Sequence, residues 1–87
     1  MMRNGELWIP NGSDYSAVLL VEKIKDNEWT CVHLVKSGEK KYMRQTGRVS
    51  SRVDPSAYYT GDGIVNENRI LECYSLASPE SYTIEGI

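Results

Sequence analysis

The fold is decided by residues 15–46, which read YSAVLLVEKIKDNEWTCVHLVKSGEKKYMRQT. The most apolar run of the chain, AVLLV at 17–21, lies near the start of this stretch and is extended by Ile24. Three of these six residues are β-branched, and clusters of turn-forming residues at 11–14 and 25–28 bound the run. We therefore expect a buried strand here, although part of the run also has helical spacing.

A second strand is predicted over residues 29–35, after a turn at Asp26 and Asn27. The residues on one face of this strand are Trp29, Cys31, His33 and Val35. Those on the other face are Thr30, Val32 and Leu34. Both faces are partly apolar, which is typical of a strand that bends around a small barrel or lies between two sheets. A turn at 37–39 and a strand over 40–46 complete an antiparallel meander, because short turns join neighbouring strands in opposite directions.

The chain before this meander predicts one short strand. Residues 6–10 end at Pro10, which lacks the N–H that a ladder needs, and Trp8 is expected to lie in the core or at its rim. The opening Gly5-Glu6-Leu7-Trp8, a loop, and then the strand Val18-Leu19-Leu20-Val21 resemble the start of several SH3-like small barrels, including the ribonuclease toxins of the MazF and PemK type. The resemblance covers about the first quarter of the chain. That family has an Arg-Pro dipeptide before its second strand and a later catalytic region, and neither has a counterpart here. The resemblance therefore implies a barrel-like topology and no activity.

The C-terminal part is less regular. Residues 53–59 suit a turn or a single 3₁₀ turn, and residues 82–84 suit an edge strand. Residues 66–77 fit two descriptions. One is a helix capped by Asn66, and the other is a strand, which we prefer because it would close the sheet. The helix would carry along one side Ile70, Leu71, Tyr74 and Ala77. The predicted fold is mainly β, a small antiparallel meander closing into an SH3-like, partly open barrel, with room for one short helix or 3₁₀ turn in the C-terminal third.

Length and composition set further limits. A chain of 87 residues predicts a single domain over 1–87, and 40% hydrophobic with 25% charged residues is ordinary for a globular protein. The longest apolar run has five residues and the N-terminus lacks a signal pattern, so we expect a soluble, cytoplasmic protein without a membrane segment. Cys31 and Cys73 are interpreted as two buried free thiols, with a disulfide between them as the alternative. These thiols and the lone His33 have no zinc-ligand spacing, so no metal or cofactor is predicted.

Charge is divided unevenly along the chain, although the net charge is only −2. Residues 36–52 hold six basic side chains and one acidic one, whereas residues 53–87 hold one basic and six acidic ones. Cations close to an aromatic ring form the composition that binds phosphate backbones and stacks on bases. The candidate binding residues of this basic segment are Lys36, Lys40, Lys41, Tyr42, Arg44, Arg48 and Arg52. The same cations could instead protect a strand edge or be neutralised by the acidic C-terminal third.

No catalytic set is recognisable. The lone His33 lies inside a predicted strand, and the carboxylates are scattered, so we do not expect an enzyme. The predicted function is a non-enzymatic macromolecular binding protein whose partner is another protein, in the manner of a small inhibitor or accessory factor of phages or mobile elements. One alternative is a small β-barrel that binds nucleic acid through residues 36–52. Another is a structural subunit whose free sheet edges pair with neighbours in an assembly.

Overall fold

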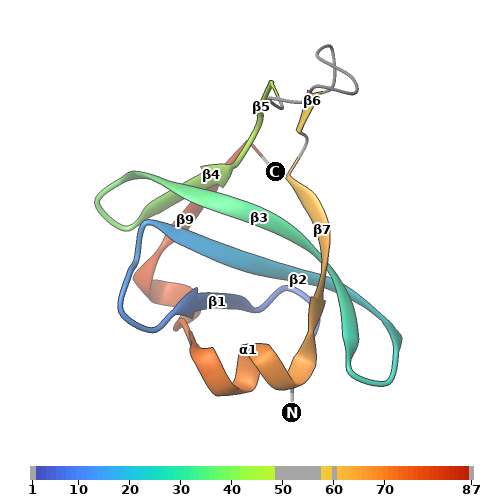
Figure 1. Cartoon of the computed structure of the whole chain (residues 1–87). Coiled ribbons are helices and arrows are strands. Elements are labelled where there is room, and N and C mark those ends of the chain that lie inside the picture. The colour runs from blue at the N-terminus through green and yellow to red at the C-terminus, as the bar shows by residue number, and fades with distance from the viewer. Residues whose placement is uncertain (1, 49–57, 60, 87) are drawn as a thin grey trace.

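The computed structural model describes residues 2–48, 58–59 and 61–86, and it is mainly β (Figure 1). One sheet contains β1 (Leu7–Pro10), β2 (Ser16–Lys25), β3 (Glu28–Gly38), β4 (Lys41–Arg44), β7 (Asp62–Asn66), β8 (Tyr74–Leu76) and β9 (Thr83–Glu85). A separate two-stranded ladder pairs β5 (Gly47–Arg48) with β6 (Tyr58–Tyr59). Most of the segment predicted as a 3₁₀ turn, residues 53–57, lies outside the described residues, and its last two residues form β6.

The predicted meander is confirmed, because β2, β3 and β4 pair in sequence order and antiparallel. The long strand β3 is the centre of the sheet. One of its edges pairs with β2, and the other pairs with β7 over its first half and with β4 over its second half. This branching of partners follows from the length of β3, which exceeds that of either β4 or β7.

The prediction that the sheet closes into a barrel was wrong for the described residues, and an SH3-like fold is not confirmed. The sheet runs in the order β8-β1-β2-β3-β4-β9, with β7 beside β4 on β3, and its end strands β8 and β9 are not paired with each other. The last pair, β4 with β9, is parallel, so the sheet is mixed rather than purely antiparallel. A parallel neighbour requires a crossover connection, and here the chain from β7 through α1 and β8 supplies it.

The ambiguous segment 66–77 is divided between both predicted structures. It forms α1 (Glu67–Cys73) and then β8, so our preference for a strand was wrong over the first part and right over the last. The side chain of Asn66 caps α1 by accepting a hydrogen bond of 3.2 Å from the backbone N–H of Arg69. Of the predicted helix side, Ile70 is buried, whereas Leu71 is 55% exposed. With η1 (Pro79–Ser81), α1 confirms a short helix and a 3₁₀ turn in the C-terminal third.

Alternation along the strands produces two apolar clusters on opposite faces of the sheet. The helix-side cluster consists of Met2, Trp8, Val18, Leu20, Trp29, Cys31 and Ile70. The open-side cluster consists of Leu7, Ala17, Val32, Leu34 and Tyr42. Sequence neighbours such as Cys31 and Val32 fall into different clusters, as the period of two requires. Both faces of β3 therefore carry buried apolar side chains, as predicted, and Trp8 is packed in the helix-side cluster, as expected.

The two cysteines are free, as preferred, but they differ in environment. Cys31 is buried in the helix-side cluster, whereas Cys73 at the end of α1 is exposed. The prediction of two buried thiols was therefore wrong for Cys73, because a seven-residue helix turns a single narrow side toward the sheet.

Candidate functional site

The cations of the predicted basic segment are largely paired within the fold. Its described ion pairs are Lys36 with Asp14 at 2.5 Å, Lys41 with Glu85 at 3.9 Å and Arg44 with Asp62 at 2.8 Å. The carboxylates come from the loop before β2, from β9 and from β7. Two of the three partners belong to the acidic C-terminal third, so the alternative of neutralisation within the fold describes these cations.

The remaining candidate residues are placed as follows. Lys40 is exposed and has no ion-pair partner among the described residues. Tyr42 is only 3% exposed, and its hydroxyl donates a hydrogen bond of 2.9 Å to the backbone carbonyl of Asp14. The ring of Tyr42 is packed in the open-side cluster, so little of it is exposed for stacking on a base. Arg48 contributes its backbone to β5, and Arg52 lies outside the described residues.

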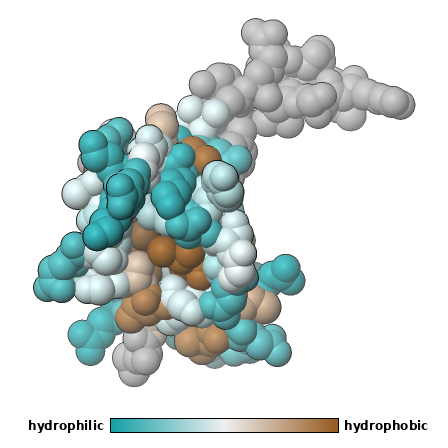
Figure 2. All heavy atoms as spheres, turned by 90° about the vertical axis from the view of Figure 1, so that its left-hand side faces the viewer, coloured by the Kyte–Doolittle hydropathy of each residue, from teal (hydrophilic) through white to brown (hydrophobic). Residues whose placement is uncertain are grey.

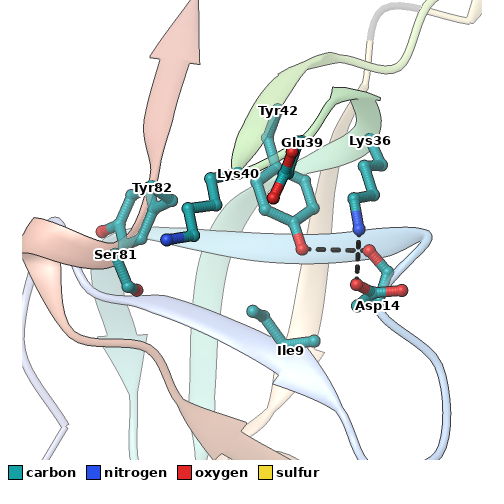
Figure 3. Close-up of a pocket in the computed structure, with 8 residues that line it drawn as sticks. All are labelled: Ile9, Asp14, Lys36, Glu39, Lys40, Tyr42, Ser81 and Tyr82. Atoms are coloured by element: carbon teal, nitrogen blue, oxygen red, sulfur yellow. Dashed lines mark hydrogen bonds and ion pairs between the residues drawn. The ribbon is translucent and has the colours of Figure 1, made fainter.

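The structure brings three of these residues, Lys36, Lys40 and Tyr42, around one pocket of about 330 Å³. The pocket opens where the loop before β2, the β3–β4 turn and the η1–β9 segment come together. Figure 2 faces this side of the molecule and shows hydrophobic side chains in the centre of the face, with hydrophilic ones around them. The centre of the pocket is Ile9 and the ring of Tyr42, both of which pack in or against the open-side cluster (Figure 3).

The two ends of the pocket differ in electrostatics. At one end, a hydrogen bond and ion pair with Lys36 lower the pKa of Asp14, and the same contact raises the pKa of Lys36. The nearby charge of Glu39 raises the pKa of Lys36 further. This end is therefore satisfied within the protein. At the other end, Lys40 extends beside Tyr82 and Ser81, and its ammonium group is not neutralised by a described carboxylate (Figure 3).

The backbone of Lys40 is unusual for a lysine. Its φ is +59°, in the left-handed region that glycine and asparagine adopt at a lower free-energy cost. Its carbonyl accepts a hydrogen bond of 2.9 Å from the N–H of Thr83, which joins the β3–β4 turn to the start of β9. The turn that carries this side chain is therefore fixed to the start of β9.

One thiol lies near the imidazole but is not arranged as a nucleophile. The Sγ of Cys31 lies 3.8 Å from the Nε2 of His33. Burial, and then the negative charge of Asp62, raise the pKa of Cys31 to about 11. A nucleophilic thiol requires the opposite shift, since the thiolate is the reactive form. The described residues also contain no group of three or more His, Cys, Asp or Glu that could hold a metal ion.

A second surface was missed by sequence reasoning. Val21 and Ile24 of β2 are each 45% exposed, and Ile64 of β7 is 61% exposed; we call these three residues the β2–β7 patch. In the register, Thr30 lies opposite both Glu22 of β2 and Ile64 of β7, so β2 and β7 flank β3 at this level. Since Trp29 and Cys31 face the helix side, Thr30 and Ile64 face the other side.

The charges around the β2–β7 patch are unevenly paired. Lys23 pairs with Glu67 at 3.9 Å, and Lys25 pairs with Glu28 at 3.2 Å. The carboxylates that neighbour the patch in sequence, Glu22 and Asp26, have no ion-pair partner among the described residues. The signal that could have revealed this surface is the order Glu22-Lys23-Ile24-Lys25, where charges interrupt the apolar run before β2 ends.

Comparison of the chain with protein-family models, with curated proteins and with solved structures gives no match. None of the helices in the described part of the chain has the length and apolar character needed to cross a bilayer.

Proposed function

We propose that this chain is a non-enzymatic binding protein that occupies a surface of another protein, as an inhibitor or accessory factor does. The observation that carries this proposal is the β2–β7 patch, three large apolar side chains that are each exposed on β2 or β7, the two strands that flank β3. Large apolar side chains that gather on a surface with a polar rim are typical of protein interaction sites. The free thiols are consistent with action in a reducing compartment, which we take to be the cytoplasm.

The chemistry of the partner follows from the charges next to the patch. Glu22 and Asp26 are not compensated by described cations, so a complementary surface would present apolar side chains flanked by lysine or arginine. The apolar contact would supply most of the affinity, and the charges would mainly raise the association rate and select the partner.

Two other functions are outcomes of the same test. Nucleic-acid binding through the basic segment is weakened by the pairing of Lys36, Lys41 and Arg44, because a cation already bound to a carboxylate gains less from a phosphate. A role as a structural subunit would use the outer edges of β7, β8 and β9, each of which pairs on one side within the described sheet.

The test is a pull-down with the tagged full chain from cells of its native host, with and without nuclease. We compare the wild-type chain, the double variant Ile24→Ser/Ile64→Ser and the control Leu71→Ser, since Leu71 is similarly exposed but lies on α1. We expect one protein to be retained after nuclease, to bind again from purified components, and to be lost with the double variant alone.

Three results would contradict this proposal. If nucleic acid is recovered without nuclease and no protein is retained after nuclease, binding through the basic segment is favoured, with an affinity that falls steeply as salt is added. Recovery of the chain itself as the sole partner would favour a structural subunit. Equal loss of the partner in the double variant and in Leu71→Ser would remove the β2–β7 patch as the binding surface.

A further inference from the structure

We infer that the pocket between the β3–β4 turn and η1–β9 binds a small organic carboxylate with an apolar body, and that Lys40 recognises the carboxylate. This site shares no residue with the β2–β7 patch, so it stands or fails independently of the proposed function. It also differs from the predicted nucleic-acid surface, because it uses a single cation of the basic segment, whereas that surface would use several.

The apolar body would lie on the centre of the pocket. Ile9 and the ring of Tyr42 form this area, and Tyr82 lines the pocket beside them (Figure 3). All three residues are in or against the open-side cluster, so the pocket is a gap in the cover of an apolar core rather than a groove between polar loops. Its volume of about 330 Å³ lies at the lower end of the range for ligand pockets, which points to a small ligand.

The charged group of the ligand is assigned by elimination among the rim residues. Lys36 is engaged by Asp14 at 2.5 Å, and Glu39 adds a negative charge near this pair. Lys40 is the rim cation without a described ion-pair partner. A carboxylate is therefore repelled at the Asp14 end and attracted at the Lys40 end, which orients the ligand in the pocket.

The hydroxyl beside Lys40 does not compete for this role. The Oγ of Ser81 donates a hydrogen bond of 2.7 Å to the carbonyl of Ser78, so its proton is engaged. The Lys40 ammonium is the positive charge at this end of the pocket, and a single substitution can test its role.

Lys40 is also presented by a constrained backbone. Its left-handed conformation would suit glycine better, and the hydrogen bond from Thr83 holds its carbonyl in place. A side chain that starts from a fixed Cα loses less freedom when it binds than one on a loose loop. The turn therefore keeps a cation over the pocket at some expense of stability.

The experiment is an NMR titration of the full chain, with amide resonances as the readout and three probes of matched shape: hexanoate, hexanamide and hexylammonium. We expect hexanoate to shift the amides of Lys40, Ser81 and Tyr82 saturably, with a Kd of about 1 mM or weaker for so few atoms. Hexanamide should bind at least about fivefold more weakly, since it lacks the charge. Hexylammonium should bind more weakly still.

Two variants with the same loss of charge locate the interaction. Lys40→Met should weaken hexanoate binding at least about fivefold, whereas Lys41→Met should leave it unchanged, because Lys41 pairs with Glu85 and does not line the pocket. Lys40→Gly gives a second test that relieves the left-handed backbone and so does not risk unfolding. It should lose binding like Lys40→Met.

A last pair of probes distinguishes two sources of the carboxylate. An acetylated tripeptide ending in leucine is compared with its C-terminal amide. Binding of the free acid more tightly than hexanoate supports a chain terminus as the ligand, and equal binding supports a free small carboxylate; both support the site. Hexanamide binding as tightly as hexanoate, equal effects of Lys40→Met and Lys41→Met, or no saturable shifts at these amides would overturn the inference.

Discussion

The two faces of the sheet are covered by different parts of the chain. The helix-side cluster is covered by α1, whose Ile70 is buried in it, and by Met2 from the N-terminal segment. The open-side cluster has no α-helix over it among the described residues. Tyr82 and Ile84 pack against this cluster, and Tyr42 forms its boundary toward the pocket. Figure 1 shows α1 on one side of the strands, away from the β3–β4 turn.

The difference shows how a small domain can divide its apolar surface between stability and binding. Alternating side chains of the same strands supply both clusters, so the sequence pattern alone does not distinguish the two faces. A cover that buries a cluster completely stabilises the fold, whereas a cover that ends early leaves an apolar floor beside charged residues, which is the usual composition of a ligand pocket.

Removal of the helical cover should have the largest effect. Ile70→Ala is expected to lower the free energy of unfolding by about 2–5 kcal/mol, because it truncates a side chain that is 1% exposed in the helix-side cluster. Leu71→Ala, at the next position of α1, should change it by less than about 0.5 kcal/mol. Urea denaturation of both variants measures the contrast. Similar losses in the two would mean that α1 does not close this face.

The helix-side cluster should also protect the Cys31 thiol from chemical modification. Cys31 is buried with a pKa raised to about 11, whereas Cys73 is exposed. In the folded protein at pH 8, a thiol reagent should modify Cys73 and react with Cys31 at least about a hundredfold more slowly, since that reaction requires opening of the fold. Mass spectrometry of the modified protein assigns the sites, and both should react in urea. Comparable native rates would contradict a closed cluster.

At the open-side cluster, the rim hydrogen bond should contribute less. Tyr42→Phe removes the hydroxyl that donates to the carbonyl of Asp14 and is expected to cost about 0.5–1.5 kcal/mol of unfolding free energy. Tyr15→Phe is the matched control, because Tyr15 is exposed. The two variants are compared by chemical denaturation. If Tyr15→Phe were as destabilising as Tyr42→Phe, the hydrogen bond would not be what secures this edge of the pocket.

Substitution of the turn lysine should change stability in the opposite direction. Lys40→Gly is expected to raise the unfolding free energy by about 0.5–1 kcal/mol, because a non-glycine residue with positive φ is strained. Asn27→Gly is the control at the other hairpin, with φ +67°, where asparagine is already tolerated, so the gain should be smaller. Thermal and urea unfolding measure both. A loss of stability in Lys40→Gly would show that its side chain supports the fold.

The smallest effect is expected from pH. Because Lys36 lowers the pKa of Asp14 below 3.8, their contact stabilises the folded protein above that pH, and the contribution is lost as the pH falls through the lowered value. Denaturation midpoints of wild-type and Asp14→Asn should therefore differ at pH 5 and converge toward pH 2. The difference should be slight, because the Asp14 carboxylate is exposed to solvent. A constant difference down to pH 2 would assign it to something other than the ion pair.

Part of the candidate site could be predicted from the sequence. The concentration of cations in residues 36–52 drew attention to Lys36 and Lys40, and the structure places both around the pocket. Neutralisation by the acidic C-terminal third was offered as an alternative, but the individual partners of the paired cations could not be predicted. Asp14, Asp62 and Glu85 are distant in sequence from these cations and approach them only in the folded chain. The burial of Tyr42 could not be predicted for the same reason, since β9 pairs with β4 beside this residue.

By itself, the sequence determined the meander of β2, β3 and β4 and the apolar character of both faces of β3, because a period of two and turn-forming residues act over a few positions and need no distant partner. Only the tertiary structure decided that residues 67–73 coil into α1, that β9 runs parallel to β4, and that one face is closed while the other keeps a pocket. The sequence predicted an edge strand at 82–84 and offered a helix capped by Asn66 as one of two descriptions of 66–77. A helix that buries one isoleucine and a strand of three residues carry too little local preference to settle the helix or the partner of the strand. Their conformations are set by the surfaces on which they pack.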